Sequence, residues 1–490
     1  MAETELSGVE DFAAVFQDFL GAMAAAARSP ETPLGARLRA HLGVDPLELP
    51  STVAEFADTD HPNLQLGLDA VMPDAEVIGY SARAASYMEL TLRDLLVGQG
   101  MNGRVGVGPV QYTNVRVGDG RVMQCVSAGL YLASRGGTPI ALLLCRTGQR
   151  PFGGGGLRVE GISTNGEAIP ALLDELRAAM REHNVYRGKI ISLHQRERCV
   201  SVQFHSVRTV ERDSVILPDG ILERVERHTV GIAAQVERLR EVDHHIKRGV
   251  LLHGPPGTGK TLTVSYLLGV MPGRTTILLT GRGQGLIEQA LGLAYELAPA
   301  TVVLEDVDLV AAERTMPGEK GILFELLNQM EGLSEDADLL FLLTTNRPDI
   351  VEPALVARPG RVDLAVELPL PDGAARARLL RVYAHGIVLD PEAEADLVTR
   401  TEGVSGAFIK ELMRQAALRA ALAGGEQATV ADVRAVLDDL LDDRSALTRR
   451  LLGQPADGSP TDTAAATPLP GMLRAFEAAG LPLPAAPGRG

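Results

Sequence analysis

The feature that most constrains this chain is a glycine-rich segment at 254–261, Gly-Pro-Pro-Gly-Thr-Gly-Lys-Thr, between an apolar run and a helical pattern. Glycines permit restricted backbone angles, so successive N–H groups can turn toward phosphate oxygens at the positive end of the helix. The lysine then meets the terminal phosphates, and the next threonine offers its hydroxyl to magnesium. The predicted phosphate-binding loop consists of Gly254, Pro255, Pro256, Gly257, Thr258, Gly259, Lys260, Thr261 and Leu262.

Buried strands downstream of this loop predict where the chemical residues lie. The apolar runs 276–279, 301–304 and 339–343 alternate with helical patterns. This alternation indicates an α/β fold with a parallel sheet covered by helices on both faces. Because ligands of such sheets bind at the carboxyl ends of the strands, polar residues that follow these runs are candidates for the site.

Two of the runs end in side chains suited to metal-assisted phosphate chemistry. Glu305 and Asp306 follow the second run, and Asn346 follows the third. One carboxylate can hold the magnesium shell while the other polarises a water for attack on the γ-phosphate. The predicted metal ligands are Thr261 and Glu305, both acids are predicted catalytic residues, and Asn346 could orient the water. Alternatively, the acids could only cap the next helix.

Several linked motifs resemble those of the AAA family of ATPases, hexameric remodelling machines with a large parallel-sheet domain and a small helical lid. The resemblance covers roughly 217–443 and is carried by the segments 254–261, 302–308, 326–332, 344–349 and 352–363. It implies an ATPase that uses ATP and magnesium. It also implies a homo-oligomeric ring, expected to be a hexamer.

The resemblance implies roles for particular residues. Lys260 and Thr261 match the Walker A pair, and Asn346 matches sensor one. Arg358 and Arg361 match arginine fingers, which reach the nucleotide of the neighbouring subunit and neutralise charge developing on the phosphoryl group. An isolated subunit should therefore hydrolyse ATP poorly.

Domain organisation follows from the same patterns. Five regions are expected: 1–70, an N-terminal helical region; 71–205, an α+β domain that could recognise a client or partner; 206–370, the large ATPase domain; 371–445, the helical lid; and 446–490, a disordered tail rich in alanine and proline. In the lid, Gly406 and Ala407 resemble the segment that packs on adenine and ribose. The segment 228–232 is placed to line the adenine pocket.

Two departures from the family pattern bear on function. Most relatives place Asp before Glu after the second strand, whereas this chain has Glu305 before Asp306. The catalytic carboxylate would lie about one carbon–carbon bond farther from the water unless the backbone adjusts, which puts the rate of hydrolysis in doubt. The segment 281–285 lacks the aromatic residue with which unfoldases of the family grip extended polypeptide. Threading of unfolded chains is therefore less secure than hydrolysis itself.

Charge and composition narrow the partners and the location. The 47 basic and 63 acidic residues give a formal net charge of −16, which repels nucleic acid without a local basic cluster. The three cysteines are scattered, without a Cys-x-x-Cys pair, and are expected to be buried thiols. The N-terminus lacks the pattern of an export signal, and no apolar run reaches transmembrane length. We expect no nucleic-acid partner, no membrane segment and a cytoplasmic location.

The sequence thus predicts an ATP-hydrolysing ring that remodels or moves a protein client selected by residues 1–205. The alternative is a slow ATP-dependent switch or scaffold that controls the assembly of a complex. The exchanged acids and the missing aromatic residue favour this alternative. The identity of the client and any protease partner stay open.

Overall fold

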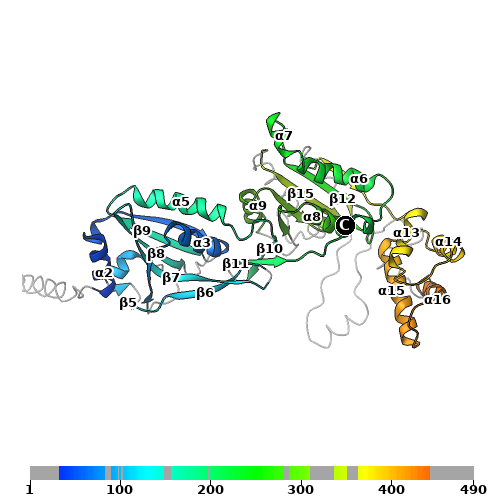
Figure 1. The fold of residues 1–490 in the computed structure, drawn as a ribbon, viewed down its shortest axis with the longest axis horizontal. Helices are drawn as coiled ribbons and strands as arrows, with labels where there is room; N and C mark the ends of the chain where they lie inside the picture. Colours follow the sequence, from blue (N-terminus) through cyan, green and yellow to red (C-terminus); the bar gives the residue numbers. More distant parts are fainter. Residues whose placement is uncertain are drawn as a thin grey trace, which may run out of the picture. The chain divides into compact units, whose positions relative to one another are not determined.

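The computed structural model describes residues 32–82, 90–97, 99–100, 103–118, 120–147, 156–196, 199–279, 286–308, 336–349 and 362–441. The chain divides into two compact units, Met1–Arg378 and Leu379–Gly490. The first unit contains a six-stranded, a seven-stranded and a three-stranded sheet within the described residues (Figure 1). The predicted tail 446–490 lies outside the described residues.

The six-stranded sheet belongs to the N-terminal part of the first unit. Its strands are β1 (Ser51–Ala57), β2 (Glu76–Ile78), β6 (Gln111–Arg116), β7 (Val122–Arg135), β8 (Thr138–Thr147) and β9 (Gly156–Ser163). Their order is β1-β9-β8-β7-β2, with β6 also paired to β7, and every pair is antiparallel. The three-stranded sheet consists of β3 (Tyr80–Ala82), β4 (Gln99–Gly100) and β5 (Gly103–Val107).

Helices cover both faces of the six-stranded sheet. On one face, α3 (His61–Val71) packs beside α5 (Ala168–Glu182), and both contribute leucines to a core shared with β7, β8 and β9 (Figure 1). On the other face, α2 (Pro33–Leu42) and α4 (Leu92–Val97) contribute leucines to a second core. The alternating burial of β8 side chains, such as Leu142 on one face and Leu143 on the other, separates these two cores.

The predicted N-terminal helical region at 1–70 is corrected by the sheet. Strand β1 pairs with β9 along its whole length, and α3 lies in the same core as α5. The described residues between 33 and 70 therefore belong to the N-terminal sheet domain and not to a separate helical cap. Sequence reasoning missed β1 because only Ala54 of this strand is buried, so its apolar pattern is weak.

The seven-stranded sheet carries the predicted phosphate loop. Its strands are β10 (Ile190–Arg196), β11 (Cys199–His205), β12 (Arg248–His253), β13 (Thr275–Leu279), β14 (Ala300–Leu304), β15 (Leu339–Thr345) and β16 (Leu364–Glu367). The order is β11-β10-β13-β14-β15-β12-β16, in which β11 pairs antiparallel with β10 and all other neighbours run parallel. The predicted α/β fold with a parallel sheet is therefore confirmed.

The hairpin β10–β11 corrects the predicted domain boundary at residue 205. Strand β10 pairs in parallel with β13, so this hairpin extends the seven-stranded sheet instead of closing the N-terminal domain. The sequence could not show this membership, because an apolar strand pattern does not say which sheet the strand joins.

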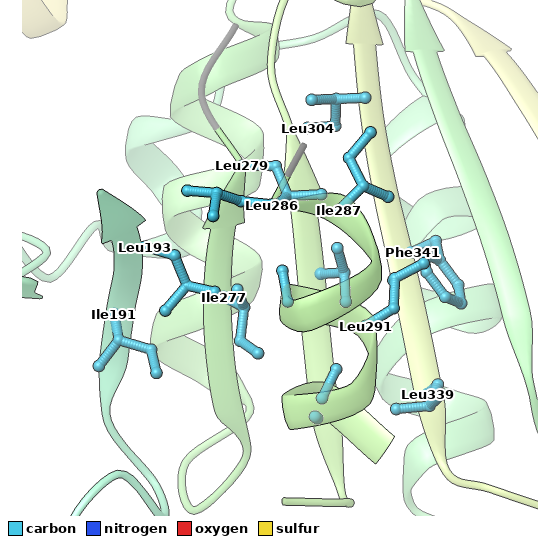
Figure 2. Close-up of a cluster of buried hydrophobic side chains, with 14 of the residues drawn as sticks. Ile191, Leu193, Ile277, Leu279, Leu286, Ile287, Leu291, Leu304, Leu339 and Phe341 are labelled. Atoms are coloured by element: carbon cyan, nitrogen blue, oxygen red, sulfur yellow. The ribbon is translucent and has the colours of Figure 1, made fainter. Parts of the chain in front are cut away.

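Helices cover both faces of the seven-stranded sheet. The helical elements of this part are η3 (Arg212–Ser214), α6 (Ile221–Glu226), η4 (Arg227–Gly231), α7 (Val236–Glu241), α8 (Lys260–Val270) and α9 (Ile287–Glu296), of which α6, α8 and α9 contribute buried side chains to the cores on the two faces. Figure 2 shows Leu286, Ile287 and Leu291 of the α9 region packed on strand residues such as Ile277 and Phe341. On the opposite face, side chains of α6 and α8 share a core with β12, β14 and β15.

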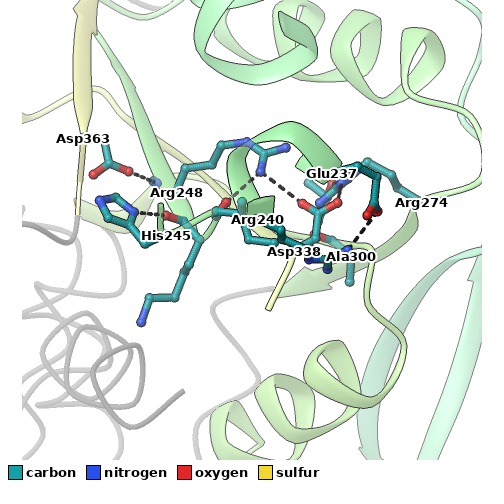
Figure 3. A network of polar contacts seen from close by, with 12 residues as sticks. Glu237, Arg240, His245, Arg248, Arg274, Ala300, Asp338 and Asp363 are labelled. Carbon is teal, nitrogen blue, oxygen red and sulfur yellow. Dashed lines mark hydrogen bonds and ion pairs between the residues drawn. The ribbon is translucent and has the colours of Figure 1, made fainter. Parts of the chain in front are cut away.

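A polar network ties together the starts of four parallel strands, β12, β13, β14 and β15, at the edge opposite the phosphate loop (Figure 3). Asp338, just before β15, accepts hydrogen bonds from Arg248 Nη1 at 3.0 Å and from Arg274 Nη1 at 2.7 Å. Arg274 also donates to the Ala300 carbonyl, at the start of β14. All three charged side chains are less than a tenth exposed. Burial and the neighbouring Arg274 lower the pKa of Arg248, opposed by Asp338.

A short connector links the two large sheets of the first unit. Tyr186 belongs to the core around α9, and its hydroxyl donates to the Thr59 carbonyl at 2.5 Å. Thr59 lies in η2 (Asp58–Asp60). The side chain of Asp60, the last residue of η2, is largely shielded from solvent. The pKa of Asp60 is raised to about 6, mainly by burial and also by the Glu296 carboxylate, while the hydrogen bond from the Ala57 amide acts in the opposite direction.

The second unit is helical where it is described. It contains the end of α13 (Gly373–Tyr383), then α14 (Pro391–Arg400), α15 (Gly406–Leu422) and α16 (Val430–Leu441). Ser405 caps α15 by accepting from the Phe408 amide at 3.3 Å, and Asp390 caps α14 by accepting from the Ala393 amide at 2.8 Å. Helices α15 and α16 pack together through their buried apolar side chains.

Replacing Asp338 by asparagine should destabilise the fold strongly. Asp338→Asn leaves two buried guanidinium groups without a countercharge, which we expect to cost about 3–5 kcal/mol of unfolding free energy in urea. Glu175→Gln is the matched control, because the Arg135–Glu175 pair is 38% and 51% exposed, and this change should cost less than about 1 kcal/mol. Equal effects of the two substitutions would contradict the role of the buried network.

Replacing Asp60 should stabilise the fold in a pH-dependent way. Because folding raises this pKa to about 6, the contribution of Asp60 is favourable below its unfolded value of 3.8 and is lost as pH rises through 6. Asp60→Asn should therefore be more stable than the wild type at pH 8, by up to about 3 kcal/mol, and nearly equal to it at pH 4. Urea unfolding at both pH values measures this, with exposed Asp74→Asn as the control. A difference that does not change with pH would refute the assignment.

Candidate functional site

The segment between β12 and α8 has the backbone of a tight glycine-dependent loop. Gly254, Gly257 and Gly259 have φ values of 141°, 76° and 98°, where side chains other than glycine are strained. A Cβ atom at Gly254 would lie 2.3 Å from the Leu368 carbonyl oxygen, so the chain that follows β16 leaves no room for one. The loop ends at the N-terminus of α8, whose first amides favour anions.

Lys260, the first residue of α8, is buried beneath this loop. Its ammonium donates to the carbonyl oxygens of Gly254 and Pro255, at 2.8 Å each, and the side chain follows the inside of the turn. Burial lowers the pKa of Lys260, while the carboxylates of Asp306 and Asp308 act in the opposite direction. The lysine therefore lies within the electrostatic reach of the acids that follow β14.

The first of these acids lies beside the start of α8. Desolvation raises the pKa of Glu305, a hydrogen bond with Thr261 lowers it, and the charge of Asp306 raises it. A hydroxyl and a carboxylate meet here at the end of the loop. Magnesium usually takes one or two protein oxygens and fills its remaining positions with phosphate oxygens and water, so this donor pair fits that ion.

The second acid is held between the ends of β14 and β15. The Asp306 amide donates to Thr344 Oγ1 at 3.0 Å, and Asn346 Nδ2 donates to Asp306 Oδ1 at 3.0 Å. Asp306 has a φ of +49°, a left-handed conformation that is uncommon outside glycine. The backbone thus departs from an extended path at the residue where the sequence exchanges the usual acids.

A third acid fixes the segment that carries Asn346. Asp308 is buried, and its Oδ1 accepts from Thr345 Oγ1 at 2.8 Å and from the Asn346 amide at 3.1 Å. Sequence reasoning gave no role to Asp308, Thr344 or Thr345. The position of the two threonines between a buried strand and Asn346 was the available signal, but only the parallel pairing of β14 with β15 brings them to the acids.

The described residues bring together Lys260, Thr261, Glu305, Asp306 and Asn346 at one edge of the sheet. Arg358, Arg361 and the segment 281–285 lie outside the described residues.

The predicted adenine-binding segments are described, but their role stays a prediction. Residues 228–232 lie mostly in the π-helix η4, which contacts α8, and π-helical turns are frequent at functional sites. Gly406 and Ala407 open α15 in the second unit.

The chain matches the family model described as "ATPase family associated with various cellular activities (AAA)" over residues 250–370. This range starts within β12 and includes the loop, the acids and Asn346. Residues 250–370 are an AAA domain. The AAA resemblance predicted from the sequence is therefore confirmed for this region.

Curated relatives point to the same family. The chain is 34% identical over 263 residues to the ATP-dependent zinc metalloprotease FtsH 3 of Sphaerobacter thermophilus, covering 50% of this chain and 54% of the relative. It is 29% identical over 263 residues to the proteasome-activating nucleotidase of Methanothermobacter thermautotrophicus, covering 47% and 64%. The nucleotidase of Thermococcus onnurineus is 29% identical over 330 residues, covering 57% and 81%.

These matches leave part of the relatives unmatched. The chain spans less than two thirds of the length of the first two relatives. Its sequence contains no His-Glu-x-x-His segment, the zinc-binding pattern of many metalloproteases. Among the helices that the structure describes, none has the length and apolar character needed to cross a membrane.

The close approach at Gly254 predicts a sharp effect of a single methyl group. Gly254→Ala should weaken nucleotide binding by at least about tenfold and lower the unfolding free energy, because the Cβ atom would overlap the Leu368 carbonyl. Binding of a fluorescent ATP analogue and urea unfolding are the measurements. Gly269→Ala is the matched control: it lies in α8 with open space around it, and alanine favours a helix by about 1 kcal/mol. Normal binding by Gly254→Ala would show that the loop does not hold the nucleotide in this conformation.

Proposed function

We propose that this chain hydrolyses ATP with magnesium, as a ring of identical subunits, and uses the reaction to remodel or move a protein client. The observation that carries the proposal is the convergence of a buried loop lysine, two acids and an asparagine at the carboxyl edge of one parallel sheet. Ligands of parallel α/β sheets bind at this edge. The fixed backbone of the loop favours phosphate as the ligand.

Each residue at this edge has a proposed task. Lys260 binds the terminal phosphates, and Thr261 with Glu305 holds magnesium, which neutralises phosphate charge. Asp306 accepts a proton from the attacking water, and Asn346 orients that water through its amide. Because Asn346 also donates to Asp306, it can hold the carboxylate and the water in a common geometry.

Assembly into a ring, expected to be a hexamer, rests on the AAA domain and on Arg358 and Arg361. These arginines are proposed to reach the nucleotide of the next subunit. The relatives named proteasome-activating nucleotidase and ATP-dependent zinc metalloprotease support a protein as the client. The N-terminal sheet domain, joined to the AAA core through Tyr186, is the proposed client-binding part. The cytoplasmic location and the lack of a nucleic-acid partner stay predictions.

The proposal predicts magnesium-dependent ATP turnover that two substitutions abolish in different ways. Lys260→Ala should lose both nucleotide binding and turnover, because the terminal phosphates lose their cation. Asp306→Asn should keep binding and lose turnover by about 10²-fold or more, because only the proton acceptor is removed. Phosphate release and binding of a fluorescent ATP analogue measure the two properties.

An exposed substitution outside the site is the control for these assays. Arg135→Gln, which removes an exposed ion pair of the N-terminal sheet, should leave turnover unchanged.

Asp306→Asn protein should also retain its client during affinity capture with ATP. Wild-type protein that releases no phosphate at any concentration, with or without the captured client, would overturn the proposed function.

A further inference from the structure

We propose that Thr344 is a positioning residue for the catalytic carboxylate: its buried hydroxyl holds the Asp306 backbone in a left-handed conformation that sets where the shorter acid reaches. This inference rests on the proposed ATPase function. It concerns how the exchanged order of Glu305 and Asp306 is accommodated. It is carried by the contacts between the ends of β14 and β15.

The backbone of Asp306 needs support from its surroundings. Its φ of +49° is disfavoured for residues with a Cβ atom, and such conformations persist where neighbouring groups hold them. Aspartate enters this region more readily than most residues, because its short polar side chain can form local hydrogen bonds. The exchange that places aspartate here therefore also makes the turn accessible.

Thr344 supplies the support. Strand β14 ends at Leu304, which lies beside Leu343 of β15, so the amide of Asp306 lies beyond the last paired residues. Thr344 is the next residue of β15, is 1% exposed, and accepts the Asp306 N–H through Oγ1 at 3.0 Å. A side-chain oxygen thus takes the place of the strand carbonyl that this amide would otherwise need.

Both the amide and the carboxylate of Asp306 are consequently fixed by residues of one short segment, 344–346. Thr344 holds its amide, and Asn346 holds its carboxylate at 3.0 Å. Asp308 secures the Asn346 amide in turn. Aspartate has one side-chain methylene, so a backbone displacement moves its carboxylate directly. Glutamate has a further torsion with which it could compensate.

The test removes the acceptor while keeping the shape of the side chain. Thr344→Val should lower kcat for ATP about 10- to 100-fold, because a catalytic group displaced by about 1 Å can lose that much. The KM for ATP and the affinity for a fluorescent ATP analogue should stay within about twofold, because the Thr344 hydroxyl bonds to the Asp306 amide and, within the described residues, forms no hydrogen bond with the loop or with Lys260. Thr344→Ser keeps the hydroxyl and should retain most of the activity. Thr344→Ala, a second variant that lacks it, should behave like Thr344→Val.

A structural defect is separated from a positioning role by two further measurements. Thr276→Val makes the same change at a buried site of the same sheet and should leave kcat unchanged. In the Asp306→Glu background, the loss caused by Thr344→Val should be at least about threefold smaller, because the longer acid depends less on the backbone. General destabilisation would not depend on the length of this acid.

The outcomes distinguish this inference from the function on which it rests. Wild-type protein without ATP turnover contradicts the proposed function and with it the role of Thr344. Active wild-type protein with an equally active Thr344→Val variant overturns the role of Thr344 alone. Equal losses for Thr344→Ser and Thr344→Val, or the same loss in both Asp306 backgrounds, also overturn it.

Discussion

The site depends on the adjacency of three parallel strands, β14, β15 and β12, in that order. Parallel strands end at the same edge of the sheet. The acids after β14, the asparagine after β15 and the loop after β12 are therefore brought together by the order of the strands alone. Thr344 Oγ1 accepts from the Asp306 amide, Thr345 Oγ1 donates to Asp308, and Asn346 Nδ2 donates to Asp306, which shows how close this convergence is. The pairing register between β14 and β15 decides which side chains meet. If one strand shifted by one residue, each of its side chains would point to the other face of the sheet.

At the opposite edge of the sheet, a buried polar network connects the starts of the same strands. Asp338 lies just before β15 and binds arginines that lie at the start of β12 and just before β13, so one buried carboxylate aligns three strand starts. Removing one partner of this network would leave a buried charge uncompensated, which is costly. The strands that carry the site are therefore held by ion pairs at one end and by the loop contacts at the other.

The N-terminal domain is built into this sheet through a hairpin. Strand β10 adds to β13, and Phe204 of β11 lies 5.9 Å from the ring of Tyr186, whose hydroxyl reaches Thr59 of the N-terminal domain. Asp60, which follows Thr59 in the chain, is desolvated and lies near the negative charge of Glu296 at the end of α9. The proposed client-binding part thus contacts the core of the AAA domain through buried groups, which is a direct physical route between the two.

The sequence by itself determined the loop, the buried strands and the identity of the acids, because glycine spacing and continuous apolar runs depend on local backbone chemistry. It predicted Lys260, Glu305, Asp306 and Asn346 as members of one site, and the structure brings them to one edge. Only the tertiary structure decided that β10 and β11 join this sheet, that β1 belongs to the N-terminal sheet, and that Thr344 supports a left-handed Asp306. These features arise from pairing between segments distant in the chain, and a local pattern carries no record of its partner.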